Sequence, residues 1–203
     1  HKIFGGFAQF IGNPRGCSVD PFAYVSDWKI DAGSLPEGWA LSAAAPQDRA
    51  ELQSYYDHVS GGLMLRVMDL EAGVCAEEEI NREFREHGFQ RERHLFALKQ
   101  SGRLKAFLIA SVADIGLNLS DLTNCIHAIV IDAEGLTHAV FAAAAGEACR
   151  LTGQGDVPAL VYPVSSAQRM ELAFGKVYHL WSFHIYAQGQ NYLKYLSRLT
   201  KYI

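Results

Sequence analysis

Hydrophobic residues from Trp39 onward recur with two different periods along the chain. Apolar residues at every second position, or in short unbroken runs, predict strands, whereas apolar residues three and four apart predict helices. By this criterion the predicted strands are 39–45, 93–100, 103–114, 125–132, 159–164 and 176–187. The predicted helices are two pieces on either side of Gly61 and Gly62, then 76–88, 135–151, 165–175 and 189–199. This mixed order predicts an α+β domain with helices packed on both faces of a sheet.

Turn and cap residues support several of these boundaries. The dipeptide Ser101-Gly102 separates two strand-like runs, which is typical of a tight antiparallel hairpin. Pro46 stands at the predicted start of a helix and Gly88 at the predicted end of another. Residues 1–35 lack this regularity, and we interpret them as an N-terminal arm, an edge strand or the tail of a preceding domain. Residues 36–203 then form the main domain.

Composition narrows the class of protein. The 203 residues are 49% hydrophobic and 20% charged, with a net charge of −4, which is typical of one globular domain. Lysine and arginine are scattered rather than clustered, so nucleic acid is not an expected partner. No apolar run reaches the roughly 18–20 residues that span a bilayer. We therefore expect no membrane span.

Cysteines 17, 75, 125 and 149 lack the spacing of a zinc site or a disulfide framework. Cys125 and Cys149 fall in apolar segments, where a cysteine usually serves as a small core hydrophobe. We expect reduced thiols, no metal site and a cytoplasmic protein. Because the chain opens on "HKIFGG", without an initiator methionine or a secretory signal, we interpret it as a fragment of a longer protein.

The order of elements from Trp39 to about Ala187 resembles that of the GNAT acyltransferase superfamily. The resemblance implies a mixed, mostly antiparallel sheet with helices on both faces. It also implies a carrier, acyl-coenzyme A or the phosphopantetheine of an acyl carrier protein, between the strand "CIHAIVID" and its neighbour. The helix that follows would bind the carrier's diphosphate at its N-terminus. By position, the groove residues are Ile129, Val130 and Ile131, and the cradle residues are Ala133, Glu134, Gly135, Leu136 and Thr137.

The loop "DAEGLTH" departs from the family pattern of a Gln or Arg followed by two close glycines. It has one glycine, no cation and two carboxylates, Asp132 and Glu134. Acidic residues at a helix N-terminus serve well as caps, but they repel a diphosphate. The loop therefore predicts weak binding of coenzyme A or none. The tyrosine with which the family protonates its leaving thiolate would stand near Met170 or Glu171, and neither is a phenol.

His127 is the best-placed candidate base for acyl transfer to an amine. Alternation places Cys125, His127, Ile129 and Ile131 on one face of their strand. The alternative is a hydrogen-bonded core histidine, which is the commoner role of a lone histidine on an apolar strand. Tyr162 and Glu171 are weaker catalytic candidates.

Two functions follow from the resemblance. The first is transfer of an acyl group from coenzyme A or an acyl carrier protein to an amine, by direct attack without a covalent enzyme intermediate. The second is a catalytically silent GNAT-like domain that binds a ligand or another domain of the same protein. The absent glycine and tyrosine favour the silent domain, and the strand-to-helix junction favours the enzyme.

Overall fold

The computed structural model describes residues 17–28, 33–60, 63–68, 70–71, 77–114 and 124–183. The predicted helix 189–199 and the end of the strand predicted over 176–187 lie outside the described residues, as do residues 1–16. Among the helices that are described, none has the length and apolarity needed to cross a membrane.

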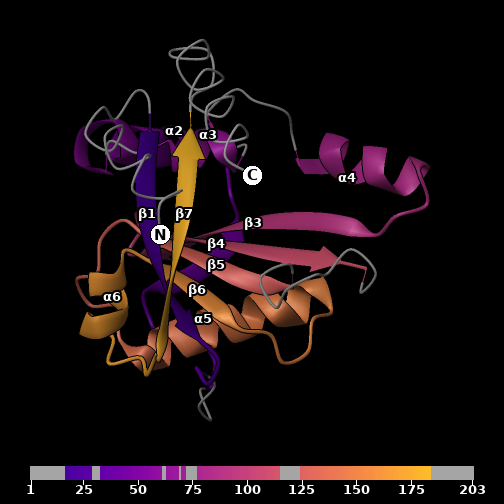
Figure 1. Ribbon diagram of the computed structural model, residues 1–203. Coiled ribbons are helices and arrows are strands. Elements are labelled where there is room, and N and C mark those ends of the chain that lie inside the picture. The colour runs from indigo at the N-terminus through magenta and orange to yellow at the C-terminus, as the bar shows by residue number, and fades with distance from the viewer. Residues whose placement is uncertain are drawn as a thin grey trace.

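The described strands form one sheet in the order β2-β3-β4-β5-β6-β1-β7 (Figure 1). Neighbouring strands are antiparallel except β5 and β6, which run parallel. This arrangement confirms the predicted mixed, mostly antiparallel sheet. The strands are β1 Cys17–Val25, β2 Trp39–Ala43, β3 Arg91–Gln100, β4 Arg103–Ala113, β5 Cys125–Val130, β6 Ala159–Tyr162 and β7 Lys176–Phe183.

Strand β1 lies inside the sheet, whereas the sequence favours an arm or an edge strand in this region. It pairs with β7 from Cys17 opposite Phe183 to Tyr24 opposite Lys176, and with β6 at its other side. Because both of its edges are hydrogen-bonded, β1 is an inner strand of the sheet. Among the described strands, the edge positions belong to β2 and β7.

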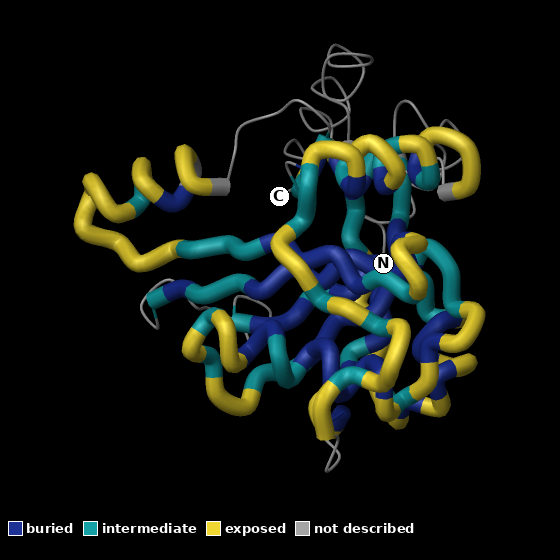
Figure 2. Tube along the Cα trace, turned by 180° about the vertical axis from the view of Figure 1, so that it is seen from behind, coloured by how far each residue is buried: buried dark blue, intermediate teal, exposed yellow. Residues whose placement is uncertain are grey.

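Helices cover both faces of the sheet, as predicted. Figure 1 shows α2 and α3 over one face and α5 and α6 over the other. Helix α4 extends beyond the end of β3, and Figure 2 shows most of it exposed. The helices are α2 Pro46–Tyr55, the π-helical turn η2 Tyr56–Ser60, α3 Met64–Val67, α4 Glu77–Glu86, α5 His138–Thr152 and α6 Val164–Arg169.

Local chemistry explains several element boundaries. Ser101 and Gly102 both adopt positive φ, at 48° and 81°, which gives the β3–β4 hairpin its tight turn. Helix α2 begins with Pro46, and the Asp48 carboxylate accepts a hydrogen bond from the Ala45 N–H at 2.9 Å. Thr137 caps α5 by accepting the Val140 N–H at 3.3 Å.

The sheet separates two apolar cores. On the α5 side, the alanines of α5 pack against the residues of β5 and β6 that face them, including Ile126, Ala128 and Val161. On the α3 side, Leu52, Tyr56 and Met64 pack against the opposite face of the same strands. Cys125 belongs to the α3-side core and Cys149 to the α5-side core, and both are buried. Their predicted role as core hydrophobes is confirmed.

Candidate functional site

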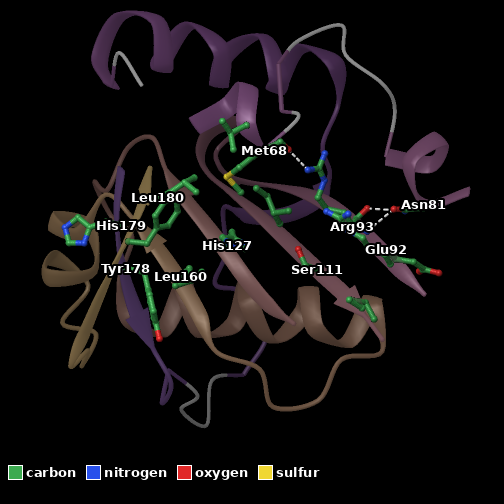
Figure 3. Close-up of a pocket in the computed structure, with 16 residues that line it drawn as sticks. Met68, Asn81, Glu92, Arg93, Ser111, His127, Leu160, Tyr178, His179 and Leu180 are labelled. Atoms are coloured by element: carbon green, nitrogen blue, oxygen red, sulfur yellow. Dashed lines mark hydrogen bonds between the residues drawn. The ribbon is translucent and has the colours of Figure 1, made fainter. Parts of the chain in front are cut away.

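A cavity of about 520 Å³ opens on the α3 side of the sheet, over β4, β5 and β6 (Figure 3). Its volume is in the range of small-molecule sites. Ile109, His127 and Leu160 contribute to the lining from three adjacent strands, and Phe22 adds an aromatic ring from β1. The remaining lining residues are Val67, Met68, Asn81, Arg91, Glu92, Arg93, Ser111, Val112, Ala113, Tyr178, His179 and Leu180.

His127 occupies the middle of this cavity, as Figure 3 shows. Its Nδ1 lies 3.4 Å from the Cys125 Sγ, and the Phe22 ring meets the imidazole edge-on with the ring centres 6.1 Å apart. Burial, together with the positive charge of Arg93, lowers the pKa of His127 to about 4. Burial also raises the pKa of Cys125 to about 12. At neutral pH both groups are therefore uncharged, and the pair is not a thiolate–imidazolium nucleophile.

Arg93 and Asn81 fix one rim of the cavity. The backbone N–H of Arg93 donates to the Asn81 Oδ1 at 3.0 Å, and the Asn81 Nδ2 donates to the Arg93 carbonyl at 3.3 Å. The Arg93 guanidinium donates to the carbonyl of Met68, which also lines the cavity. These contacts connect α4, β3 and the end of α3 around the opening.

Tyr162 is the last residue of β6, and the Phe22 ring contacts both Tyr162 and His127. The centre of the Phe22 ring lies 6.1 Å from that of His127 and 5.3 Å from that of Tyr162. Tyr162 is 8% exposed and is not part of the cavity lining. The structure therefore brings the two predicted residues onto one face of the sheet, with an aromatic ring between them.

Asp20 is a buried carboxyl that the sequence pattern does not predict. It is 4% exposed and accepts hydrogen bonds from Tyr162 and from the Ser18 Oγ, the latter at 2.9 Å. Burial raises the pKa of Asp20 although both hydrogen bonds act in the opposite direction. The one sequence signal was an acidic residue within the apolar alternation "SVDPFAYV", in a region interpreted as an arm.

Glu171 lies apart from His127 and Tyr162. It follows α6, is exposed and has a positive φ of 56°. Its neighbours Met170 and Leu172 pack into the α5-side core. A role for Glu171 together with the cavity stays a prediction without geometric support.

The junction between β5 and α5 contains a cation that the loop itself lacks. The Lys105 Nζ lies 2.6 Å from the Asp132 Oδ2, and the Lys105 side chain is only 7% exposed. Asp132 also accepts the backbone N–H of Glu134 at 2.9 Å. The hydrogen bond from Lys105, followed by the one from Glu134, lowers the pKa of Asp132. The loop sequence predicts two unopposed carboxylates, whereas in the structure Lys105 offsets the charge of Asp132.

A β-bulge explains how Lys105 reaches the junction. Leu98 pairs with Ala106 and Lys99 with Leu104, so Lys105 has no partner in the β3–β4 ladder. Its carbonyl accepts the N–H groups of both Ile131 and Asp132, at 2.9 and 3.1 Å. A bulge redirects a side chain away from the regular alternation, and here it directs Lys105 to the residue after β5. A lysine inside the apolar run "RLKAFLIA" was the available signal.

The predicted carrier residues divide into buried and exposed groups. Ile129 pairs with Phe107 of β4 and with Tyr162 of β6, and it is fully buried; Val130 is 2% exposed and Ile131 is partly buried. Leu136 is buried in the α5-side core, and Ala133 packs against that core. Exposed at the junction are Glu134, Gly135 and Thr137.

Gly135 has a φ of 74°, and a Cβ there would lie 3.2 Å from the Gln100 side-chain amide. Both the backbone conformation and this close approach favour glycine. With respect to metals, no group of three or more His, Cys, Asp and Glu suited to a metal ion occurs among the described residues.

Comparison with solved proteins finds similar structures at low sequence identity. A GCN5-related N-acetyltransferase-like protein from Streptococcus suis is 13% identical, with a TM-score of 0.44 over 89% of this chain and 67% of that one. A GCN5-related N-acetyltransferase from Kribbella flavida is 9% identical, with a TM-score of 0.40 over 82% of this chain and 59% of that one. A functionally unknown conserved protein from Staphylococcus epidermidis is 8% identical, with a TM-score of 0.43 over 91% and 68% of the two chains.

Neither the protein-family models nor the curated sequences give a match. The sheet order and the parallel β5–β6 pair give the chain a divergent GNAT-like fold, as the order of elements predicts. At these identities and TM-scores, the matches carry no conclusion about activity.

Proposed function

We propose that this domain transfers an acyl group from coenzyme A or an acyl carrier protein to an amine bound in the His127 cavity. The observation that carries the proposal is the placement of two sites on one strand. His127 lines the cavity from the middle of β5, and the α5 N-terminus follows the end of the same strand. Asp132 follows His127 by five positions, which is about 16 Å in an extended chain. An acyl carrier held at the junction could therefore extend along β5 toward the cavity.

The reaction needs few groups from the protein. The amine nitrogen attacks the thioester carbonyl, the C–N bond forms, the C–S bond breaks, and the amine loses a proton as the thiolate leaves. The neutral imidazole of His127 can accept a hydrogen bond from the attacking amine. Tyr162 is a weaker catalytic candidate, because its hydroxyl already donates to Asp20 and its side chain does not line the cavity.

The junction is less hostile to an anion than its sequence suggests. Lys105 offsets the charge of Asp132, so Glu134 is the remaining acidic side chain on its exposed surface. Thr137 already occupies the Val140 N–H, which leaves fewer donors for a phosphate than an uncapped helix offers. We therefore expect coenzyme A to bind weakly, with Glu134 as the removable obstacle.

Titration calorimetry of acetyl-coenzyme A against the wild type and Glu134→Gln tests the junction. Removing one exposed charge at a helix N-terminus is worth about 0.3–1 kcal/mol, so the variant should bind about two- to fivefold more tightly. Glu51→Gln, an exposed substitution on α2, is the matched control and should leave affinity unchanged. Equal affinity in all three proteins would place the carrier elsewhere.

Turnover is measured as release of free thiol from acyl-coenzyme A in the presence of a panel of amines. We expect thiol release that depends on the amine and that falls at least tenfold in His127→Leu, in line with the usual contribution of a positioned base. Release that persists unchanged in His127→Leu would remove His127 from the reaction.

A silent ligand-binding domain is the second candidate, and one observation favours it. The β5–β6 ladder is closed from Ile126 opposite Ala159 to Ile129 opposite Tyr162. The carrier therefore meets open backbone no earlier than Val130, whose side chain is itself buried. Binding of ligands in the cavity without any amine-dependent release of thiol would support this reading.

A further inference from the structure

The walls of the His127 cavity are mainly apolar. Ile109 and Leu160 are buried residues of the α3-side core, and Leu180 packs against that core. Phe22 and Tyr178 add aromatic surface from β1 and β7. Figure 3 shows Leu160, Tyr178 and Leu180 on the β7 side of His127. Such walls suit a flat, apolar body better than a polar chain.

The charge that acts on the centre of the cavity is positive. Arg93 lines the rim, and its charge acts on His127. Glu92 is the carboxylate among the described lining residues. It is next to Arg93 on β3, so the two side chains point to opposite faces of the strand, and the Glu92 Oε2 lies 3.3 Å from the His94 Nε2. Figure 3 shows the Glu92 side chain directed away from His127. An ammonium ion would therefore meet a like charge at the rim and apolar walls inside, which is an unfavourable environment for a desolvated cation.

We propose that the acceptor bound in this cavity is a weakly basic amine, uncharged at neutral pH and carried on an aromatic body, rather than an alkylammonium ion. The inference rests on the proposed transfer reaction, because it names the acceptor class of that reaction. An uncharged amine already has the free electron pair that attacks the thioester carbonyl. It gives up its proton only as the C–N bond forms, when the nitrogen has become strongly acidic.

His127 fits this acceptor class and not the alkylammonium class. With a pKa near 4, its imidazole is too weak a base to remove a proton from an alkylammonium ion before attack. It can accept the proton of an anilinium-like nitrogen during or after attack, because such nitrogens are also weakly basic. Cys125, the nearest side chain on the same strand face, stays protonated and cannot act as an alternative base.

The test compares binding of two isomeric amines at pH 7, by ligand-observed NMR and calorimetry on the full chain. 4-Ethylaniline and 2-phenylethylamine have the same atoms and nearly the same size, but the first is neutral and the second is an ammonium ion. We expect 4-ethylaniline to bind about tenfold more tightly or better. Ser111→Phe fills the cavity and should abolish its binding, whereas Ser42→Phe, on an exposed position of β2, is the matched control and should not. Ala113→Leu is a second, smaller filling variant in case Ser111→Phe does not fold.

The outcomes separate the acceptor class from the reaction. Equal or tighter binding of 2-phenylethylamine would overturn the inference, and so would 4-ethylaniline binding that survives in the folded filling variants. Cavity binding of 4-ethylaniline without acyl transfer from any thioester would support the cavity preference and refute the proposed function. Acylation of alkylamines but not of anilines would support the function and refute the inference.

Discussion

The two sides of the sheet differ in what they bury. On the α5 side, Ala144, Ala145 and Ala148 are fully buried and bring the α5 backbone close to the strands. On the α3 side, the sheet buries the carboxyl of Asp20 and half-buries the imidazole of His127. The first arrangement is typical of a face whose role is stability, and the second is typical of a face that carries chemistry.

The difference extends to the quality of packing. The α3 side contains a cavity of about 520 Å³ and the buried Ser182 hydroxyl, which has no hydrogen-bond partner among the described residues. Cavities and unpaired polar groups are destabilising, and natural proteins retain them where function requires them. We infer that the α5 side supplies much of the stability that allows the α3 side to remain imperfectly packed.

The largest expected effect comes from truncating one buried isoleucine on each side. Ile126 and Ile109 are both fully buried, but Ile126 faces the alanines of α5 and Ile109 lines the cavity. Ile126→Ala should lower the free energy of unfolding by about 2–5 kcal/mol. The loss caused by Ile109→Ala should lie at the low end of that range, because Ile109 already borders the cavity. Urea denaturation of both variants measures the difference. A larger loss in Ile109→Ala would contradict the contrast between the two sides.

A smaller effect is expected from adding volume. Ala144→Leu introduces a branched side chain into the close contact between α5 and the sheet, which should cost about 1–3 kcal/mol. Ala113→Leu adds the same atoms at a position that lines the cavity and should change the stability little. Thermal unfolding of the two variants in parallel is the measurement. Equal destabilisation would mean that the cavity side is packed as tightly as the α5 side.

Local patterns in the sequence predict most of the elements and the hairpin, because alternation and turn residues act over a few neighbours. Ser101 and Gly102 predict the β3–β4 turn, and the alternation of β5 predicts that Cys125 and His127 share a face. Both features are confirmed. The fold class follows from the order of these elements, since few sheet topologies accommodate it.

The remaining features depend on pairing between distant segments. Strand β1 inserts between β6 and β7, whose paired residues come from 134 to 166 positions later in the chain, and no local pattern indicates those partners. Asp20 therefore could not be connected with Tyr162. The contact between Lys105 and Asp132 depends on a bulge in β4, which shifts alternation by one residue.

The smallest expected effect concerns the buried carboxyl of the α3 side and its dependence on pH. Burial raises the pKa of Asp20 above 3.8, so the folded state binds this proton more tightly than the unfolded state. The stability that this proton contributes is present below pH 3.8 and is lost as the pH rises through the raised value.

Asp20→Asn has no such proton, and its amide oxygen can still accept a hydrogen bond from Ser18 or Tyr162. Relative to the wild type, the variant should therefore gain stability from pH 3 to pH 7, and urea midpoints at several pH values measure this gain.

Asp27→Asn, an exposed position just after β1, controls for the loss of one negative charge. Other carboxyls titrate equally in both proteins, so the slope of the difference with pH isolates Asp20, whereas a constant offset reports only the changed hydrogen bonds. A difference that does not vary with pH would mean that Asp20 is as well solvated as a surface carboxyl. It would contradict the view that the α3 side of the sheet buries a titratable group at this position.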